Sequence, residues 1–223
     1  MERKNKKIRA VLFDVGNTLL FPDYPFIRKL LSEYQIEVSV ATLKALDFEA
    51  KVKTQNLQAH QPWKHYFTVW LTSAGVQDRD LPELFRKLWQ RHRHKNLWSL
   101  VDQEVYPTLK ELKNREYRLG VISNSDGKIK RLLNEAGLLT YFDTVADSGL
   151  VGARKPDPII FEGAVRELKM NPEEALFVGD SYEMDVVGAL NAGLSALLFD
   201  PLNKGSELGC SRIGRLSDLL NIV

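Results

Sequence analysis

Four short segments of the chain carry residue types that could do chemistry together. Asp14 lies near the end of an apolar run, Ser123 ends another, Asp180 follows a third, and Lys155 precedes Pro156. A carboxylate can act as a nucleophile or bind a metal ion. A hydroxyl beside successive backbone N–H groups can bind an anion, and a rigidly placed lysine supplies a positive charge. Gathered in one place, these groups would suit chemistry on an anionic substrate.

Each segment also has an ordinary structural interpretation. Asp14 could belong to an Asx-type turn, Ser125 or Asp126 could cap the next helix, Lys155 could be an exposed turn residue, and Ser181 could be a helix N-cap. Taken singly, these interpretations are reasonable. The occurrence of all four segments in order, each at the end of an apolar run, favours a shared functional site.

The elements that must position these residues follow from the apolar pattern. Short runs rich in Val, Ile, Leu and Phe predict buried strands over residues 8–15, 119–123, 175–179 and 194–199, with a further short strand at 145–146. Helical patterns lie between them, over residues 108–115, 128–136, 158–168 and 185–192. This alternation predicts an α/β fold with a Rossmann-like parallel sheet, and it places the ligand site beyond the carboxyl ends of the strands.

Residues 21–100 interrupt the alternation. Apolar residues recur there near helical spacing, prolines punctuate them, and no strand-like run is evident. We therefore expect an α/β core made of residues 1–20 and 101–223, with an all-helical insertion, or cap, over residues 21–100. Its four tryptophans are expected in the core of the insertion, and the basic stretch over residues 86–95 is expected to form a solvated helix face.

Composition excludes several classes of protein. The chain has 223 residues, a net charge of +2 and 44% hydrophobic residues, which suits a globular protein and gives no sign of a nucleic-acid partner. No apolar run reaches membrane-spanning length. The basic residues Arg3, Lys4 and Lys6 precede an apolar stretch too short for a signal peptide, and Cys210 has no second cysteine to pair with. We expect a cytoplasmic protein, and its oligomeric state is left open.

Together the four segments resemble the four sequence motifs of the haloacid dehalogenase-like superfamily. The residues that carry the resemblance are Phe13-Asp14-Val15-Gly16-Asn17-Thr18, Ser123-Asn124, Lys155-Pro156 and Gly179-Asp180 with Asp185. The similarity covers residues 8–20 and roughly residue 106 onward. The insertion lies where that superfamily carries its α-helical cap, which sets substrate specificity.

The resemblance implies a phosphatase-type hydrolase that acts on a small phosphorylated metabolite. Asp14 would be the nucleophile and would form an aspartyl-phosphate. Mg²⁺ would be bound by Asp14, by Asp180 and by the backbone carbonyl of Gly16.

The same resemblance assigns the remaining site residues. Ser123 and the N–H of Asn124 would bind phosphate oxygens, and Lys155 would offset negative charge on the nucleophile and the phosphate. Asp185 would orient Lys155 or a metal-bound water, and Thr18 would brace the loop after the first strand.

Gly16 is a departure from the family pattern. Most phosphatases of the group have an aspartate at this position, which protonates the leaving group. One interpretation is a Mg²⁺-dependent phosphatase that acts on good leaving groups or uses Asn17, Asp126 or a cap residue instead. A second is a dehalogenase, which the Gly179-Asp180 pair disfavours because those enzymes lack it and need no Mg²⁺. A third is a weakly active or non-catalytic binding or regulatory protein.

Overall fold

The chain divides into two compact units. The structure is a computed structural model that describes residues 7–54 and 62–223, so Arg3, Lys4 and Lys6 lie outside the described residues. One unit, here called the core unit, comprises Met1–Leu20 and Val101–Val223. The other, the inserted unit, comprises Phe21–Leu100.

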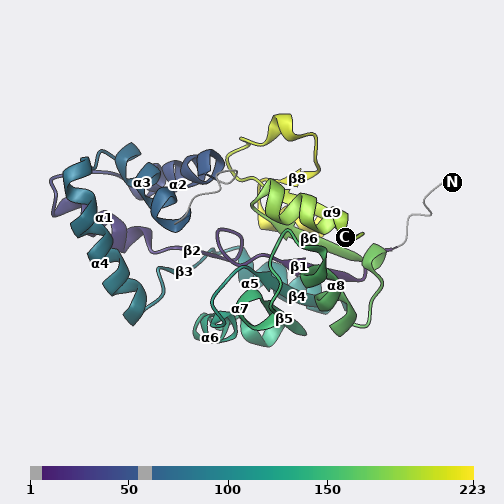
Figure 1. The fold of residues 1–223 in the computed structure, drawn as a ribbon. Coiled ribbons are helices and arrows are strands. Elements are labelled where there is room, and N and C mark those ends of the chain that lie inside the picture. The colour runs from purple at the N-terminus through teal and green to yellow at the C-terminus, as the bar shows by residue number, and fades with distance from the viewer. Residues whose placement is uncertain (1–6, 55–61) are drawn as a thin grey trace. The chain divides into compact units, whose positions relative to one another are not determined.

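The core unit is built on a parallel six-stranded sheet with the strand order β5-β4-β1-β6-β7-β8 (Figure 1). Its strands are β1 (Ala10–Phe13), β4 (Arg118–Ser123), β5 (Thr144–Asp147), β6 (Ala175–Gly179), β7 (Ser195–Phe199) and β8 (Arg212–Ile213). The central strands β1 and β6 are buried along their whole length, as expected for a parallel sheet covered on both faces. The predicted α/β fold class is confirmed.

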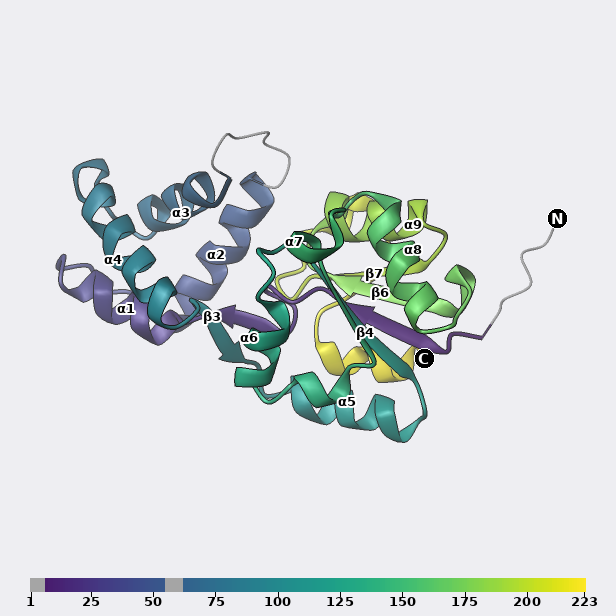
Figure 2. The same cartoon turned by 60° about the horizontal axis from the view of Figure 1, so that its bottom comes forward.

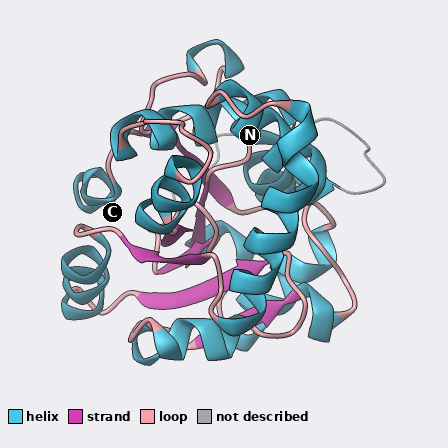
Figure 3. Cartoon of the chain, turned by 90° about the vertical axis from the view of Figure 1, so that its left-hand side faces the viewer, coloured by secondary structure: helices cyan, strands magenta, loops and turns pink. Residues whose placement is uncertain are grey.

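Helices of the core unit lie on both faces of this sheet (Figures 2 and 3). Its α-helices are α5 (Val105–Asn114), α6 (Ile129–Glu135), α7 (Ser148–Val151), α8 (Pro158–Glu167) and α9 (Gly188–Asn191). Its 3₁₀ helices are η2 (Leu139–Tyr141), η3 (Pro172–Glu174), η5 (Ser206–Leu208) and η6 (Leu216–Asn221), and η4 (Tyr182–Val187) is a π-helix. The helix expected over residues 185–192 therefore begins three residues earlier, as a π-turn.

Alternation along β1 explains how both faces are filled. Ala10 and Leu12 belong to the apolar cluster that includes residues of α8 and α9. Side chains alternate across a strand, so Phe13 points to the opposite face, where its ring meets the edge of Phe142. Burial of both faces fixes the register of β1, and with it the position of the residue that follows Phe13.

The inserted unit is mainly helical. It contains α1 (Tyr24–Ser32), α2 (Val40–Thr54), α3 (Pro62–Ser73), the 3₁₀ turn η1 (Asp78–Asp80) and α4 (Leu81–His94). Its core includes Trp70, whose indole N–H donates to the Leu43 carbonyl. A carboxylate lies beside it: Asp47 is fully buried and accepts hydrogen bonds from the hydroxyls of Tyr24 and Tyr66.

Two expectations for this segment are wrong in part. Its ends are not helical, because β2 (Leu20–Pro22) and β3 (Trp98–Val101) pair as a two-stranded sheet. Such short runs carry little periodicity, and their pairing joins residues far apart in sequence. Trp63 and Trp89 are also not core residues: both are about half exposed and stack on each other.

The basic stretch of α4 is only partly a solvated face: Arg86, Arg93 and His94 are exposed, whereas Lys87, Arg91 and His92 are partly buried. Several of its cations are paired. Arg86 bonds Glu83, Lys87 bonds Glu33, and Arg91 bonds Asp23. Within residues 7–54 and 62–223, no helix combines the length and the apolar character needed to cross a membrane.

Candidate active site

Asp14 is held at the carboxyl edge of the sheet by the loop that follows β1. Its backbone N–H donates to the Val178 carbonyl of β6 at 2.9 Å. The Val15 carbonyl then accepts the N–H groups of Leu19 and Leu20, which closes a tight loop. Asn17 has a positive φ of 60°, a conformation that asparagine tolerates better than most residues. The short loop leaves the Asp14 carboxylate at the end of the strand.

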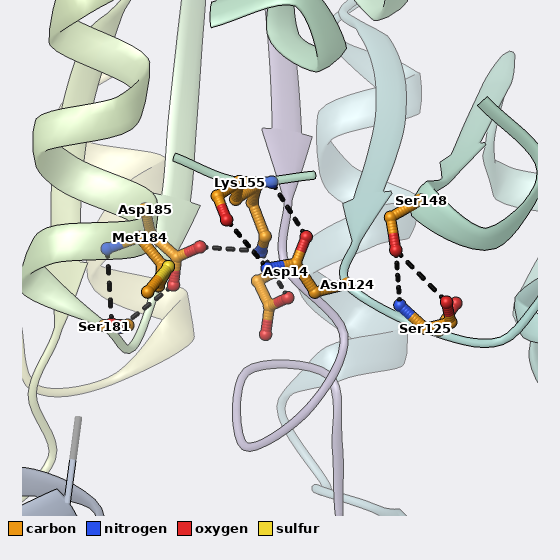
Figure 4. A network of polar contacts seen from close by, with 8 residues as sticks. All are labelled: Asp14, Asn124, Ser125, Ser148, Lys155, Ser181, Met184 and Asp185. Carbon is orange, nitrogen blue, oxygen red and sulfur yellow. Dashed lines mark hydrogen bonds and ion pairs between the residues drawn. The ribbon is translucent and has the colours of Figure 1, made fainter. Parts of the chain in front are cut away.

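Lys155 joins two of the predicted carboxylates. Its ammonium donates to Asp14 Oδ1 and to Asp185 Oδ1, both at 2.6 Å (Figure 4). All three side chains are buried, and the ammonium lies 5.2 Å from the centre of the Phe177 ring. Charge-assisted bonds of this kind in a dry environment hold a side chain in one place. Residues 141 and 30 positions apart in sequence therefore form one unit.

Asp180 completes a carboxylate cluster. One oxygen from each of Asp14, Asp180 and Asp185 lies within 4.8 Å of the others. When all three are ionised, these carboxylates and Lys155 together carry a net charge of −2. Hard oxygen donors with that charge suit a divalent cation such as Mg²⁺. The donor set therefore fits the expected metal.

Burial and neighbouring charges shift the pKa values of Asp185 and Lys155. Burial raises the pKa of Asp185 to about 6; Lys155 opposes this rise, while the charges of Asp14 and Asp180 add to it. Burial acts to lower the pKa of Lys155, but Asp14 and Asp185 outweigh it and raise that pKa above its ordinary value. Lys155 is thus a permanent cation at neutral pH.

Gly179 allows Asp185 to reach this position. A Cβ atom added to Gly179 would lie 2.4 Å from the Asp185 carboxyl carbon, so any side chain here would displace the carboxylate. The second Asp185 oxygen accepts the Ser181 N–H at 2.9 Å. Ser181 also caps the π-helix by accepting the Met184 N–H, so its predicted N-cap role is seen (Figure 4). π-Turns of this kind are frequent at functional sites.

The side chain of Asn124 is used within the protein. Its amide nitrogen donates to the Lys155 carbonyl at 3.0 Å, and its amide oxygen accepts the Lys155 N–H at 2.8 Å. This two-point contact fixes the Lys155 backbone beside the end of β4 (Figure 4). Residue types alone suggested an anion-binding loop, but they did not reveal this bracing.

Asp147 and Ser148 contact the loop that follows β4, and the sequence interpretation did not identify them. The buried Asp147 carboxylate accepts the N–H groups of Gly127, Ile129 and Gly149, each at 3.0 Å. Burial acts to raise the Asp147 pKa, but the hydrogen bonds that its carboxylate accepts hold it below its ordinary value. A polar residue directly after the short strand at 145–146 was the available signal. Asp147, rather than Ser125 or Asp126, bonds the first N–H of α6.

The other predicted residues lie in the core unit with varied surroundings. Ser123 is the buried last residue of β4, at the same sheet edge as Asp14 because Val121 pairs with Phe13. Gly16 forms an isolated bridge with Leu20. Thr18 is buried in the loop after β1, and its hydroxyl has no hydrogen-bond partner among the described residues.

Asp126, the candidate proton carrier, is exposed. Its side chain is 65% accessible and forms an ion pair with Lys128.

Comparison with known proteins places these features in a family. A sequence model described as "Hydrolase: haloacid dehalogenase-like hydrolase" matches residues 8–193. "Haloacid dehalogenase-like hydrolase domain-containing protein 3" of Homo sapiens is 30% identical over 207 residues, 86% of this chain and 82% of that protein. "N-acylneuraminate-9-phosphatase" of Rattus norvegicus is 29% identical over 222 residues, 92% and 87% of the two chains.

A solved structure agrees with the sequence matches. The crystal structure of a HAD phosphatase from Thermococcus onnurineus superposes with a TM-score of 0.62 at 27% identity, covering 96% of this chain and 97% of that one.

Proposed function

The chain belongs to the haloacid dehalogenase-like hydrolase family, and on that premise we propose that it is a Mg²⁺-dependent phosphatase with Asp14 as its nucleophile. The observation that carries the proposal is the contact of Lys155 with both Asp14 and Asp185, beside Asp180. A buried cation bonded to the nucleophile would fix the direction of its carboxylate and balance negative charge beside it. Phosphatase names among the similar proteins support the same class of reaction.

Asp14, Asp180 and the backbone carbonyl of Gly16 would bind the metal ion. When bound, Mg²⁺ would neutralise negative charge on the carboxylates and the phosphate. Asp185 accepts from Lys155 and from the Ser181 N–H, so it would act by orienting Lys155.

The reaction proposed for these residues has two displacements. An Asp14 oxygen attacks phosphorus, a bond forms between them, and the bond from phosphorus to the substrate oxygen breaks with its electron pair on that oxygen. Water then attacks phosphorus, the bond to Asp14 breaks, and inorganic phosphate leaves with the carboxylate restored. Ser123 and the Asn124 N–H would bind the phosphate oxygens during both steps, and Lys155 would balance their charge.

Gly16 makes the rate of hydrolysis depend on the stability of the leaving group. Without a side chain there, no carboxyl group two residues after the nucleophile can protonate the leaving oxygen. General acid catalysis contributes about 10²–10⁴-fold, so an aryl phosphate with a stable leaving group should exceed an alkyl phosphate by about that factor. The proposed substrate is a small phosphorylated metabolite, with no nucleic-acid or membrane partner.

A phosphatase assay with Mg²⁺ tests the proposal. We expect hydrolysis of p-nitrophenyl phosphate and of a panel of metabolite phosphates, lost on chelation of Mg²⁺ and lost in Asp14→Asn. Asp143→Asn is the matched control, because Asp143 is another hydrogen-bonded aspartate of the core unit, just before β5.

Two results would overturn the proposal in favour of an alternative. Release of halide from 2-haloacids that depends on Asp14 and needs no Mg²⁺ would indicate a dehalogenase. Binding of Mg²⁺ and phosphate without any hydrolysis that depends on Asp14 would indicate a binding or regulatory protein.

A further inference from the structure

The loop after β4, residues 123–129, is fastened to the segment that ends β5. Ser148 makes a reciprocal pair with Ser125: its hydroxyl accepts the Ser125 N–H at 3.0 Å and donates to the Ser125 carbonyl at 3.1 Å (Figure 4). The two hydrogen bonds hold the peptide groups on both sides of Ser125. Ser125 comes two residues after Ser123, so this contact acts directly on the proposed phosphate-binding segment.

Asp147 fastens the second half of the same loop. Its carboxylate accepts the N–H groups of Gly127 and Ile129, so one buried anion ties the loop to the start of α6. A charged acceptor makes each of these bonds stronger than a neutral one.

Gly149 brings the two backbones into direct contact. A Cβ atom at this position would lie 2.7 Å from the Gly127 nitrogen, 2.8 Å from the Asp126 carbonyl carbon and 2.9 Å from the Ser125 carbonyl oxygen. Position 149 must therefore be glycine for the backbone of the loop to approach the segment after β5 this closely. This close approach is a separate constraint from the hydrogen bonds, and it acts on residues 125–127 of the loop.

We propose that Asp147, Ser148 and Gly149 form a clamp that pre-organises the phosphate-binding loop after β4, which makes Asp147 and Ser148 positioning residues for the reaction. The inference rests on the proposed function, because it assigns that loop to the phosphate. A loop held in its binding conformation loses less entropy when the ligand binds. The clamp therefore acts on affinity for the phosphate group and touches neither the nucleophile nor the carboxylate cluster in any contact of the described residues.

Asp143 supplies a matched control at the other end of the same strand. Asp143 immediately precedes β5 and Asp147 ends it, so the two aspartates lie at opposite ends of the same strand. Asp143 also accepts a backbone N–H, that of Leu119 at 2.8 Å, and its pKa is also held below its ordinary value despite burial. Asp143→Asn should destabilise the fold in a similar way without moving the loop.

The test measures binding of inorganic phosphate by calorimetry in the presence of Mg²⁺, together with amide hydrogen exchange of residues 123–129. We expect Asp147→Asn and Gly149→Ala each to weaken phosphate binding by about tenfold, a factor that a small misplacement of a binding group readily produces. KM for a phosphate ester should rise by a similar factor while kcat changes little, and exchange in the loop should become faster. Ser148→Ala should act in the same direction, and Ser148→Thr should restore affinity.

The outcomes separate this inference from the proposed function. If the wild type binds phosphate and hydrolyses esters while Asp147→Asn and Gly149→Ala match Asp143→Asn in affinity and loop exchange, the clamp is refuted and the proposed function stands. If the wild type neither binds phosphate nor hydrolyses esters, both are refuted. Gly149→Ala keeps the test decisive where Asp147→Asn does not fold, because it removes no buried charge.

Discussion

Replacement of Lys155 by methionine is the perturbation that bears most directly on the cluster. Methionine keeps an unbranched side chain of similar length and removes the ammonium, so the two 2.6 Å bonds to Asp14 and Asp185 are lost. Removing one partner of a buried ion pair costs about 3–5 kcal/mol, because the remaining charge stays buried without compensation. Two carboxylates are affected here, so we expect about 4 kcal/mol or more in the absence of Mg²⁺.

Urea unfolding of the Mg²⁺-free protein measures this loss. With a urea m value of about 2 kcal/mol per M, a loss of about 4 kcal/mol lowers the unfolding midpoint by about 2 M. Far-UV circular dichroism is the appropriate signal, because all four tryptophans lie in the inserted unit and their fluorescence does not report on the core unit.

Mg²⁺ should restore part of the lost stability. A ligand at 100 times its dissociation constant stabilises the folded state by about 2.7 kcal/mol. The ion should bind Lys155→Met more tightly than the wild type, since no ammonium competes for the same carboxylates. Lys128→Met is the control: Lys128 is exposed and forms a surface ion pair with the exposed Asp126, so its loss should cost about 1 kcal/mol or less.

The reasoning would be refuted by either of two results. One is an Mg²⁺-free midpoint for Lys155→Met close to that of Lys128→Met. The other is an increase in stability with Mg²⁺ that is no larger for Lys155→Met than for the wild type.

Three further outcomes are expected. Gly179→Ala should weaken Mg²⁺ binding measured by calorimetry, because the added Cβ would displace the Asp185 carboxylate. Gly163→Ala is the control, because its added Cβ meets open space and should leave the affinity unchanged. Equal Mg²⁺ affinities of the two variants would contradict this reasoning. Asp47→Ala should destabilise the inserted unit by about 1.5–3 kcal/mol for each tyrosine hydrogen bond to the carboxylate that is lost, seen by tryptophan fluorescence during urea unfolding. An unchanged midpoint would contradict it. The Asp147 pKa is lowered below 3.8, so the ionised carboxylate stabilises the folded state above that pH, and this contribution is lost as the pH falls through the folded-state pKa. The difference in unfolding free energy between the wild type and Asp147→Asn should therefore shrink from about pH 6 to about pH 3. A constant difference would contradict it.

Local patterns were sufficient to locate the chemistry-bearing residues along the chain. The apolar runs ending near Asp14, Ser123 and Gly179 predicted strands, and a parallel sheet brings the carboxyl ends of its strands to one edge. The same rule applies to Asp147, but the strand that it ends contains only two apolar residues, so Asp147 was not assigned to the site. Short runs such as those of β2 and β3 were missed for the same reason: three or four residues carry too little periodicity.

The sequence by itself determined the α/β architecture and the positions of the polar residues at strand ends, because burial on both faces of a parallel sheet constrains residue type at every position. Tertiary structure alone decided how those residues are used. Lys155 bonds a carboxylate 141 positions away, Asn124 braces the Lys155 backbone, and Asp147 holds a loop some 20 residues before it. Hydrogen bonds between distant segments depend on where the folded chain places each donor and acceptor, and no local pattern of residues records that placement.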